Sequence, residues 1–219
     1  MSIRTGRVRH LSVVPDLPDT DESSDGGGTK PTGRGLVNLV LRVTVDHTRP
    51  QIWRRLRVRS DLLLSELHSV LQCAVGWEDR HMHAFSLRAA GSTRRFEMAQ
   101  TLDDEPRAEA ASEERVRIDE VLTSPGSVLA YEYDFGDGWT HTVELEQIDS
   151  DIDDLRSVCL DGARACPPED CGGPSHYAQD LEIAHDPADP ELPALLSRWG
   201  PGFNPARFDV DAVNRKLFS

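Results

Sequence analysis

The chain has 219 residues, of which 38% are hydrophobic, and 38 Asp and Glu against 24 Lys and Arg give it a net charge of −14. This charge disfavours general binding to nucleic acid, whose phosphates are also negative, although a local basic patch could override it. No apolar run approaches the ~20 residues that a membrane span needs. Four cysteines without a signal peptide indicate a reducing compartment. We therefore expect a cytoplasmic protein without a membrane segment.

The composition changes near residue 35. Residues 1–34 are rich in Gly, Ser and Asp and lack hydrophobic periodicity, which predicts a disordered N-terminal tail. Residues 35–219 are long enough for one domain with its own core. Within it, residues 99–120 carry eight acids against three arginines, so we expect an acidic insertion or loop without chemistry.

Two strands are predicted at the start of the domain, over residues 36–46 and 51–59, because both stretches are apolar and β-branched. In the second strand, alternation places Arg55, Arg57 and Arg59 on one face. This row is either a solvated face that pairs with the chain's own acids or a contact for DNA.

An amphipathic helix is predicted over residues 64–75, where leucines recur at intervals of three and four. Ser60 or Asp61 would help to start this helix, and Gly76 is a natural end for it. The helical phase places His68 on the buried stripe.

Two hairpins follow the helix. The first joins strands over residues 81–88 and 94–98, and alternation puts His81 and His83 on the same face of it. The second covers residues 129–145, where apolar and polar residues alternate on both sides of a Gly-Asp-Gly turn.

The second hairpin carries several polar side chains at its tip. Alternation places His141 beside Trp139 on the apolar face and points Asp134 the other way, unless a bulge at Gly136 re-aims its carboxylate. Asp137 lies in the turn itself.

The C-terminal third begins with an ordered loop rich in Cys, Gly and Pro over residues 159–177. Helices are predicted at about residues 175–184, 191–199 and 209–217, the last with Asp209 as its N-cap. The fold class that follows is α+β: an antiparallel sheet of about six strands with one early helix and a C-terminal helical layer.

Five motifs, in this order, resemble the plasmid pRiA4b ORF-3-like family from about residue 36 onwards. They are Pro50-x-Ile52-Trp53-Arg54-Arg55, Leu67-His68 with Gly76-Trp77, His81-x-His83-x-Phe85, Tyr133-Asp134-Phe135-Gly136-Asp137-x-Trp139-x-His141, and Cys166-Pro-Pro-Glu-Asp-Cys-Gly-Gly173 with Tyr177. The resemblance implies an α+β domain with an antiparallel sheet. It also implies an association with plasmids and insertion elements, where some relatives are labelled resolvase-like. This sequence lacks the arginine-rich catalytic pattern of serine and tyrosine recombinases.

The histidines are the first candidate site. If the ends of their strands coincide, His81, His83 and His141 converge at a sheet edge, where Asp134 or Asp137 would help them to bind a divalent metal. The alternative is that each histidine is hydrogen-bonded separately in a polar-lined core.

The cysteine-rich loop is the second candidate. Cys159, Cys166 and Cys171, with His176 shortly after, could hold zinc tetrahedrally. The alternatives are reduced structural thiols, a redox-sensitive pair or a disulfide.

The third candidate is the pair Glu169 and Asp170, held between two prolines and two glycines. These carboxylates either bond loop amides and cap the next helix or complete a polar pocket with the hairpin tip.

Together these patterns favour a binding or adaptor protein associated with mobile elements, whose partner is a protein or a small molecule. Nucleotide loops, serine-hydrolase elbows and metalloprotease helices are absent from the sequence. A metal-dependent hydrolase, with zinc or another divalent metal, and a DNA-contacting accessory protein are the alternatives. The candidate pocket comprises His81, His83, Asp134, Asp137, Trp139, His141, Glu169 and Asp170.

Overall fold

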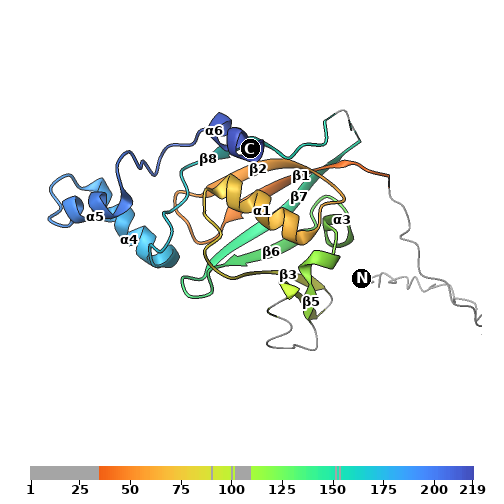
Figure 1. Ribbon diagram of the computed structural model, residues 1–219. Coiled ribbons are helices and arrows are strands. Elements are labelled where there is room, and N and C mark those ends of the chain that lie inside the picture. The colour runs from red at the N-terminus through yellow and green to blue at the C-terminus, as the bar shows by residue number, and fades with distance from the viewer. Residues whose placement is uncertain (1–34, 90, 100, 102–109, 151, 153) are drawn as a thin grey trace, which may run out of the picture. The chain divides into compact units, whose positions relative to one another are not determined.

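The computed structural model describes residues 35–219, except residues 90, 100, 102–109, 151 and 153. The predicted N-terminal tail and the middle of the acidic stretch lie outside the described residues. The rest forms an α+β structure in which helices pack on one extended sheet (Figure 1). The predicted fold class is confirmed.

The sheet has eight strands among the described residues, two more than the predicted six, in the order β5-β4-β3-β6-β7-β1-β2-β8. Neighbouring strands are antiparallel, except that β5 runs parallel to β4. The strands are β1 (Asn38–Val45), β2 (Ile52–Arg59), β3 (His83–Ala89), β4 (Ser92–Glu97), β5 (Ala110–Ser112), β6 (Val128–Tyr133), β7 (Trp139–Asp149) and β8 (Val158–Ala163).

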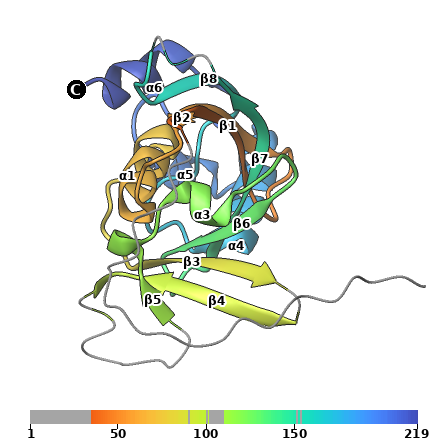
Figure 2. The ribbon, with the colours of Figure 1, turned by 90° about the vertical axis from the view of Figure 1, so that its right-hand side faces the viewer.

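The sheet arches around one helix, α1 (Leu64–Val75), as Figure 2 shows. The buried stripe of α1, which includes Leu64, Leu67 and Leu71, joins the core formed by the inner faces of the strands. A single turn of 3-10 helix, η1 (Glu113–Arg115), follows β5 and leads to the short helix α3 (Ile118–Val121), and α6 (Val210–Leu217) packs against α1 and β8. The remaining helices are α4 (Gly173–His185) and α5 (Leu192–Trp199).

Both ends of α1 have a local cause. Gly76 ends the helix with a φ of 106°, and its N–H donates to the carbonyl of Gln72 at 2.8 Å. At the other end the N-cap is Leu63, whose N–H donates to the Glu66 carboxylate at 2.8 Å. The helix therefore begins at Leu64 as predicted, but Ser60 and Asp61, which were expected to help to start it, are not its N-cap. None of the helices in the described part of the chain is long and apolar enough to cross a membrane.

Candidate functional site

The tip of the hairpin between β6 and β7 is built on Asp134. This residue has a φ of 54°, so its side chain leaves the alternation of the strand. Its Oδ1 accepts the N–H groups of Gly136 at 3.0 Å and Asp137 at 3.2 Å, which fixes the turn. Its Oδ2 faces His81 at 3.6 Å from Nε2. Phe135, the next residue, is 40% exposed.

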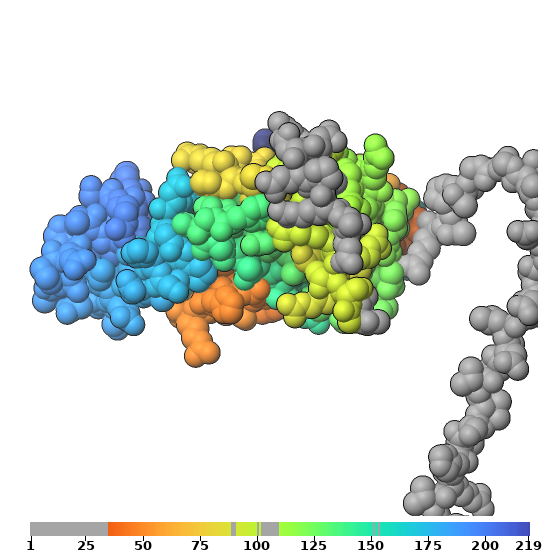
Figure 3. All heavy atoms as spheres, turned by 90° about the horizontal axis from the view of Figure 1, so that it is seen from below, coloured from red at the N-terminus to blue at the C-terminus, as the bar shows by residue number. Residues whose placement is uncertain are grey.

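The loop that precedes α4 lies directly against this tip. The Gly172 N–H donates to Asp137 Oδ2 at 2.9 Å, and the Trp77 indole donates to the Pro167 carbonyl at 3.0 Å. In Figure 3 the green surface of the hairpin borders the cyan surface that leads into α4. Residues from two distant parts of the chain therefore share one surface.

Gly173 makes this contact sterically specific. A Cβ built on Gly173 would lie 2.3 Å from the carbonyl oxygen of Asp137, whereas one on Gly200 would meet nothing within 4 Å. Both glycines have a positive φ, 80° at Gly173 and 82° at Gly200, where ψ is 165°. Gly200→Ala therefore measures the cost of alanine at a positive φ without a steric clash.

We expect Gly200→Ala to lower the free energy of unfolding by about 1 kcal/mol and Gly173→Ala to lower it by about 2 kcal/mol. Urea denaturation of both variants gives the comparison. Equal losses would mean that the loop yields without strain and that its contact with the hairpin is not a constraint.

Three carboxylates surround the imidazole of His81. Its Nε2 lies 2.8 Å from Asp170, 3.6 Å from Asp134 and 4.0 Å from Glu169. We call His81, Asp134, Glu169 and Asp170 the tip site. The side chain of Asp170 is 59% exposed and that of Glu169 only 11% exposed, so the tip site opens to solvent on one side.

Tyr133 anchors the inner side of the tip site. Its hydroxyl donates to Glu169 Oε1 at 3.0 Å and accepts the Arg80 N–H at 2.9 Å. The Glu78 N–H also donates to Glu169 Oε1, at 2.8 Å. Burial, together with the adjacent Glu169, raises the pKa of Tyr133 to about 12, so the hydroxyl stays a donor.

The predicted convergence of His81, His83 and His141 is wrong. Strand β3 begins only at His83, so His81 does not follow its alternation. Strand β6 separates β3 from β7, and on it His83 pairs with Tyr133 while His141 pairs with Tyr131. Among the described residues, two groups of possible metal ligands have ligand atoms within 4.8 Å of one another. His81 belongs to one group and His83 to the other, and His141 belongs to neither.

His141 and Trp139 are core residues. Trp139 is 2% exposed and His141 is fully buried, with its ring edge-on to Trp77 at 5.3 Å. The Tyr131 carbonyl lies 3.3 Å from Nδ1. Burial lowers the pKa of His141 to about 4, which keeps the ring neutral.

A second polar group lies deeper, around His83. The His83 ring stacks on His68 and contacts Glu113. Glu113 is only 2% exposed, although it belongs to the acidic stretch that was expected to be a loop without chemistry. Sequence reasoning missed Glu113 and Asp79 because neither lies in a periodic segment. The one available signal was His68, which the helical phase placed on the buried stripe.

The cysteines pack as apolar residues. Cys159 lies in β8, and it joins the core together with Cys171, while Cys166 packs against that core. All four cysteines of the chain are free thiols. Burial raises the pKa of Cys171 to about 12 and also raises the pKa values of Cys159 and Cys166, so these thiols stay protonated in the metal-free chain. Neither group of possible metal ligands among the described residues contains these thiols or His176.

The row of arginines on β2 is paired within the chain. Arg55 lies 2.6 Å from Glu146, Arg57 lies 3.6 Å from Asp154 and Arg59 lies 2.7 Å from Asp61. These ion pairs favour a solvated face over a DNA contact.

The opposite face of β2 carries Arg54, which is 3% exposed. This side chain lines a cavity of 460 Å³ between the end of α1, the loop at Cys166 and the segment before α6. Its guanidinium lies 4.3 Å above the ring of Phe208.

A mostly antiparallel sheet arched over one helix, with a polar site where a hairpin tip meets a Pro-Gly loop, defines an α+β class of domain. Within that class, the chain belongs to the plasmid pRiA4b ORF-3-like family, whose model matches residues 38–212. The uncharacterized protein y4hQ of Sinorhizobium fredii is 35% identical over 150 residues, which cover 68% of this chain and 73% of that protein.

A solved structure shares the fold. The protein of unknown function MM3350 from Methanosarcina mazei has a TM-score of 0.71 and 28% sequence identity, over 80% of this chain and 97% of that chain. The comparisons therefore agree with the fold described above and name no activity.

Proposed function

We propose that the protein is a binding or adaptor protein that holds a basic segment of a protein partner at the tip site. The observation that carries this proposal is the pairing of buried carboxylates with exposed apolar side chains. Asp134 and Glu169 have side chains only 12% and 11% exposed. Met82 and Phe135, the chain neighbours of His81 and Asp134, are 45% and 40% exposed.

The charge of the tip site supports a cationic ligand. Three carboxylates face one imidazole, so a lysine or arginine side chain would find uncompensated negative charge there. Arg80 offsets part of this charge, because its Nη1 lies 3.9 Å from Asp170. Since Asp170 is on the open side, an incoming guanidinium would displace Arg80 rather than a buried group.

The apolar side chains support a protein partner over a free metabolite. Exposed Met and Phe side chains beside polar groups are typical of protein interfaces, where a few large side chains supply much of the affinity. The backbone ties them to the site, because the Asp134 N–H donates to the Met82 carbonyl at 2.9 Å. The link to mobile elements that the family resemblance implies belongs to the same proposal.

The test is an array of peptides that carry Arg or Lys next to an apolar residue, probed with the full chain. The double variant Asp134→Asn with Glu169→Gln removes two charges but keeps the acceptor oxygens that Gly136 and Glu78 use. We expect this double variant to bind the peptides at least tenfold more weakly than the wild type. A control, Glu182→Gln with Glu191→Gln, removes two exposed acids outside the site and should retain them. Equal binding by both double variants would contradict the proposal.

One observation favours a metal-dependent hydrolase as the second candidate. One ligand atom each of His81, Asp134 and Asp170 lies within 4.8 Å of the others, which suits a hard divalent cation such as Mn²⁺. Hydrolysis of a nitrophenyl phosphodiester with Mn²⁺, lost in His81→Ala, would favour this function over the adaptor. Absence of turnover with bound Mn²⁺ would leave the binding function as the better account.

A further inference from the structure

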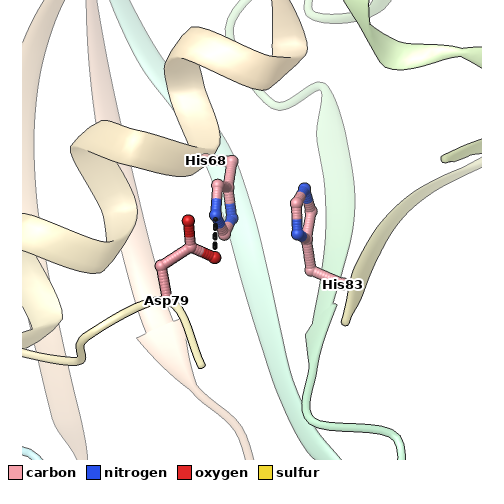
Figure 4. Close-up of side chains that lie close together, drawn as sticks. All are labelled: His68, Asp79 and His83. Atoms are coloured by element: carbon pink, nitrogen blue, oxygen red, sulfur yellow. Dashed lines mark hydrogen bonds and ion pairs between the residues drawn. The ribbon is translucent and has the colours of Figure 1, made fainter. Parts of the chain in front are cut away.

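A second group of possible metal ligands lies apart from the tip site, between α1 and β3. It consists of His68 on α1, Asp79 in the turn after α1, and His83 at the start of β3, and one ligand atom of each lies within 4.8 Å of the others. Figure 4 shows the two imidazole rings face to face with the Asp79 carboxylate beside them. We call these three residues the histidine site.

One nitrogen of each ring is held by a buried partner. His68 Nδ1 lies 2.8 Å from the hydroxyl of Tyr131, which accepts the Gln72 amide at 2.9 Å. His83 Nε2 lies 3.0 and 3.1 Å from the two oxygens of Glu113. A carboxylate or hydroxyl behind each imidazole is the usual arrangement around metal-binding histidines, because it fixes the ring and increases its basicity.

The other nitrogen of each ring remains for a ligand. His68 Nε2 contacts Asp79 Oδ1 at 2.9 Å. His83 Nδ1 is buried and has no hydrogen-bond partner among the described residues, although the His83 side chain is only 3% exposed. A buried polar atom without a partner destabilises the folded state, and a bound cation would remove that cost.

We propose that His68, Asp79 and His83 bind a divalent transition metal such as Zn²⁺. Two imidazoles and one carboxylate supply three protein ligands and leave a position for water or a substrate atom, as in open zinc sites. The Asp79 side chain is 61% exposed, so the ion has a path from solvent. The Asp79 backbone is held in place by its N–H, which donates to Gln72 Oε1 at 2.9 Å.

Binding requires a small movement of the rings. Their centroids lie 3.5 Å apart and their planes differ by 4°. An ion about 2.1 Å from each nitrogen lies near the plane of each ring, so the rings must turn away from parallel. The χ2 torsion of histidine is soft, so this rotation costs little torsional energy. Without an ion, the two imidazole rings stack in van der Waals contact.

The experiment is a titration of the untagged full chain, first treated with a chelator, with Zn²⁺ and separately with Co²⁺. We expect one equivalent of either metal, a visible Co²⁺ spectrum with imidazole ligands, and a higher urea midpoint with Zn²⁺. Asp79→Asn should weaken the affinity for Zn²⁺ by more than tenfold. Glu113→Gln should weaken this affinity by about 10–100-fold, because Glu113 contacts His83 at Nε2, on the side away from the ion. His83→Gln should abolish stoichiometric binding.

The controls separate this site from its neighbours. His81→Gln, in the tip site, and Cys166→Ser with Cys171→Ser should keep the metal. If His83→Gln does not fold, Asp79→Asn decides, because its side chain lies largely in solvent. The proposal is overturned if the wild type takes up no stoichiometric Zn²⁺ or Co²⁺, if Asp79→Asn binds as tightly as the wild type, or if the His81 or cysteine variant loses the metal instead.

Discussion

Arg54→Met lowers the free energy of unfolding by about 3–5 kcal/mol, which is the largest effect that we expect from one substitution. Arg54 donates from Nε to the Ala74 carbonyl at 2.8 Å and from Nη1 to the carbonyls of Trp53 and Ala163 at 2.8 and 3.0 Å. Ala74 is in the last turn of α1, where carbonyls lack helical partners and the helix dipole favours a cation. Methionine fills similar space but removes all three of these hydrogen bonds, of which the one to Ala74 is fully buried.

Arg55→Met is the matched control, since Arg55 is the next residue on the same strand and faces the other side. In its ion pair with Glu146 the Arg55 side chain is 40% exposed to solvent, so the loss of stability should stay within about 1 kcal/mol. Urea denaturation at neutral pH measures both. Similar losses for the two variants would show that the hydrogen bonds from Arg54 to the three carbonyls contribute little to stability.

Acidification should destabilise the protein through His141. The folded state holds the pKa of this ring at about 4, below the ordinary value of 6.5. As pH falls through 6.5 the unfolded chain takes up a proton that the folded chain refuses, so stability is complete above pH 6.5 and declines toward pH 4. The loss amounts to about 2 kcal/mol at pH 5 and about 3 kcal/mol below pH 4. Burial and the adjacent His83 also lower the pKa of His68, which adds a loss in the same direction.

The measurement is the free energy of unfolding in urea at pH 7, 6 and 5 for the wild type, His141→Gln and His185→Gln. His141→Gln removes the buried titrating ring. Between pH 7 and pH 5 its free energy of unfolding should therefore fall by about 2 kcal/mol less than that of the wild type. His185 is exposed at the end of α4, and its variant should follow the wild type. A His141→Gln profile parallel to that of the wild type would mean that other groups cause the acid sensitivity.

Local patterns predicted the elements that have local causes. The helix over residues 64–75 is confirmed to the residue, because a leucine stripe defines its length and Gly76 ends it. The hairpin of β6 and β7 was equally clear from its alternation. Strand β5 was missed because Ala110–Ser112 is three residues long and has no pattern. Strand β8 was missed because its stretch looks like the start of a Gly- and Pro-rich loop.

The candidate sites depended on long-range pairing, which the sequence does not show. The sequence suggested that the hairpin tip and the loop at Glu169 and Asp170 share a pocket, and the structure brings them together around His81. The predicted convergence of the three histidines failed because β6 lies between the strands of His83 and His141, and because His81 precedes β3. The positive φ of Asp134, which aims its carboxylate at His81, has no signature in the alternation.

The order of strands has a consequence for synthesis on the ribosome. Strand β1 pairs with β2 on one side and with β7 on the other. Val45, the last residue of β1, and Trp139, the first of β7, are about 90 residues apart. At about 5–20 residues per second, β1 waits roughly 5–20 s for its second partner. During that interval the edge of β1 that contains Leu41 and Val43 has no strand to pair with. We therefore expect the nascent chain to need a holding chaperone, and any product truncated before β7 to aggregate.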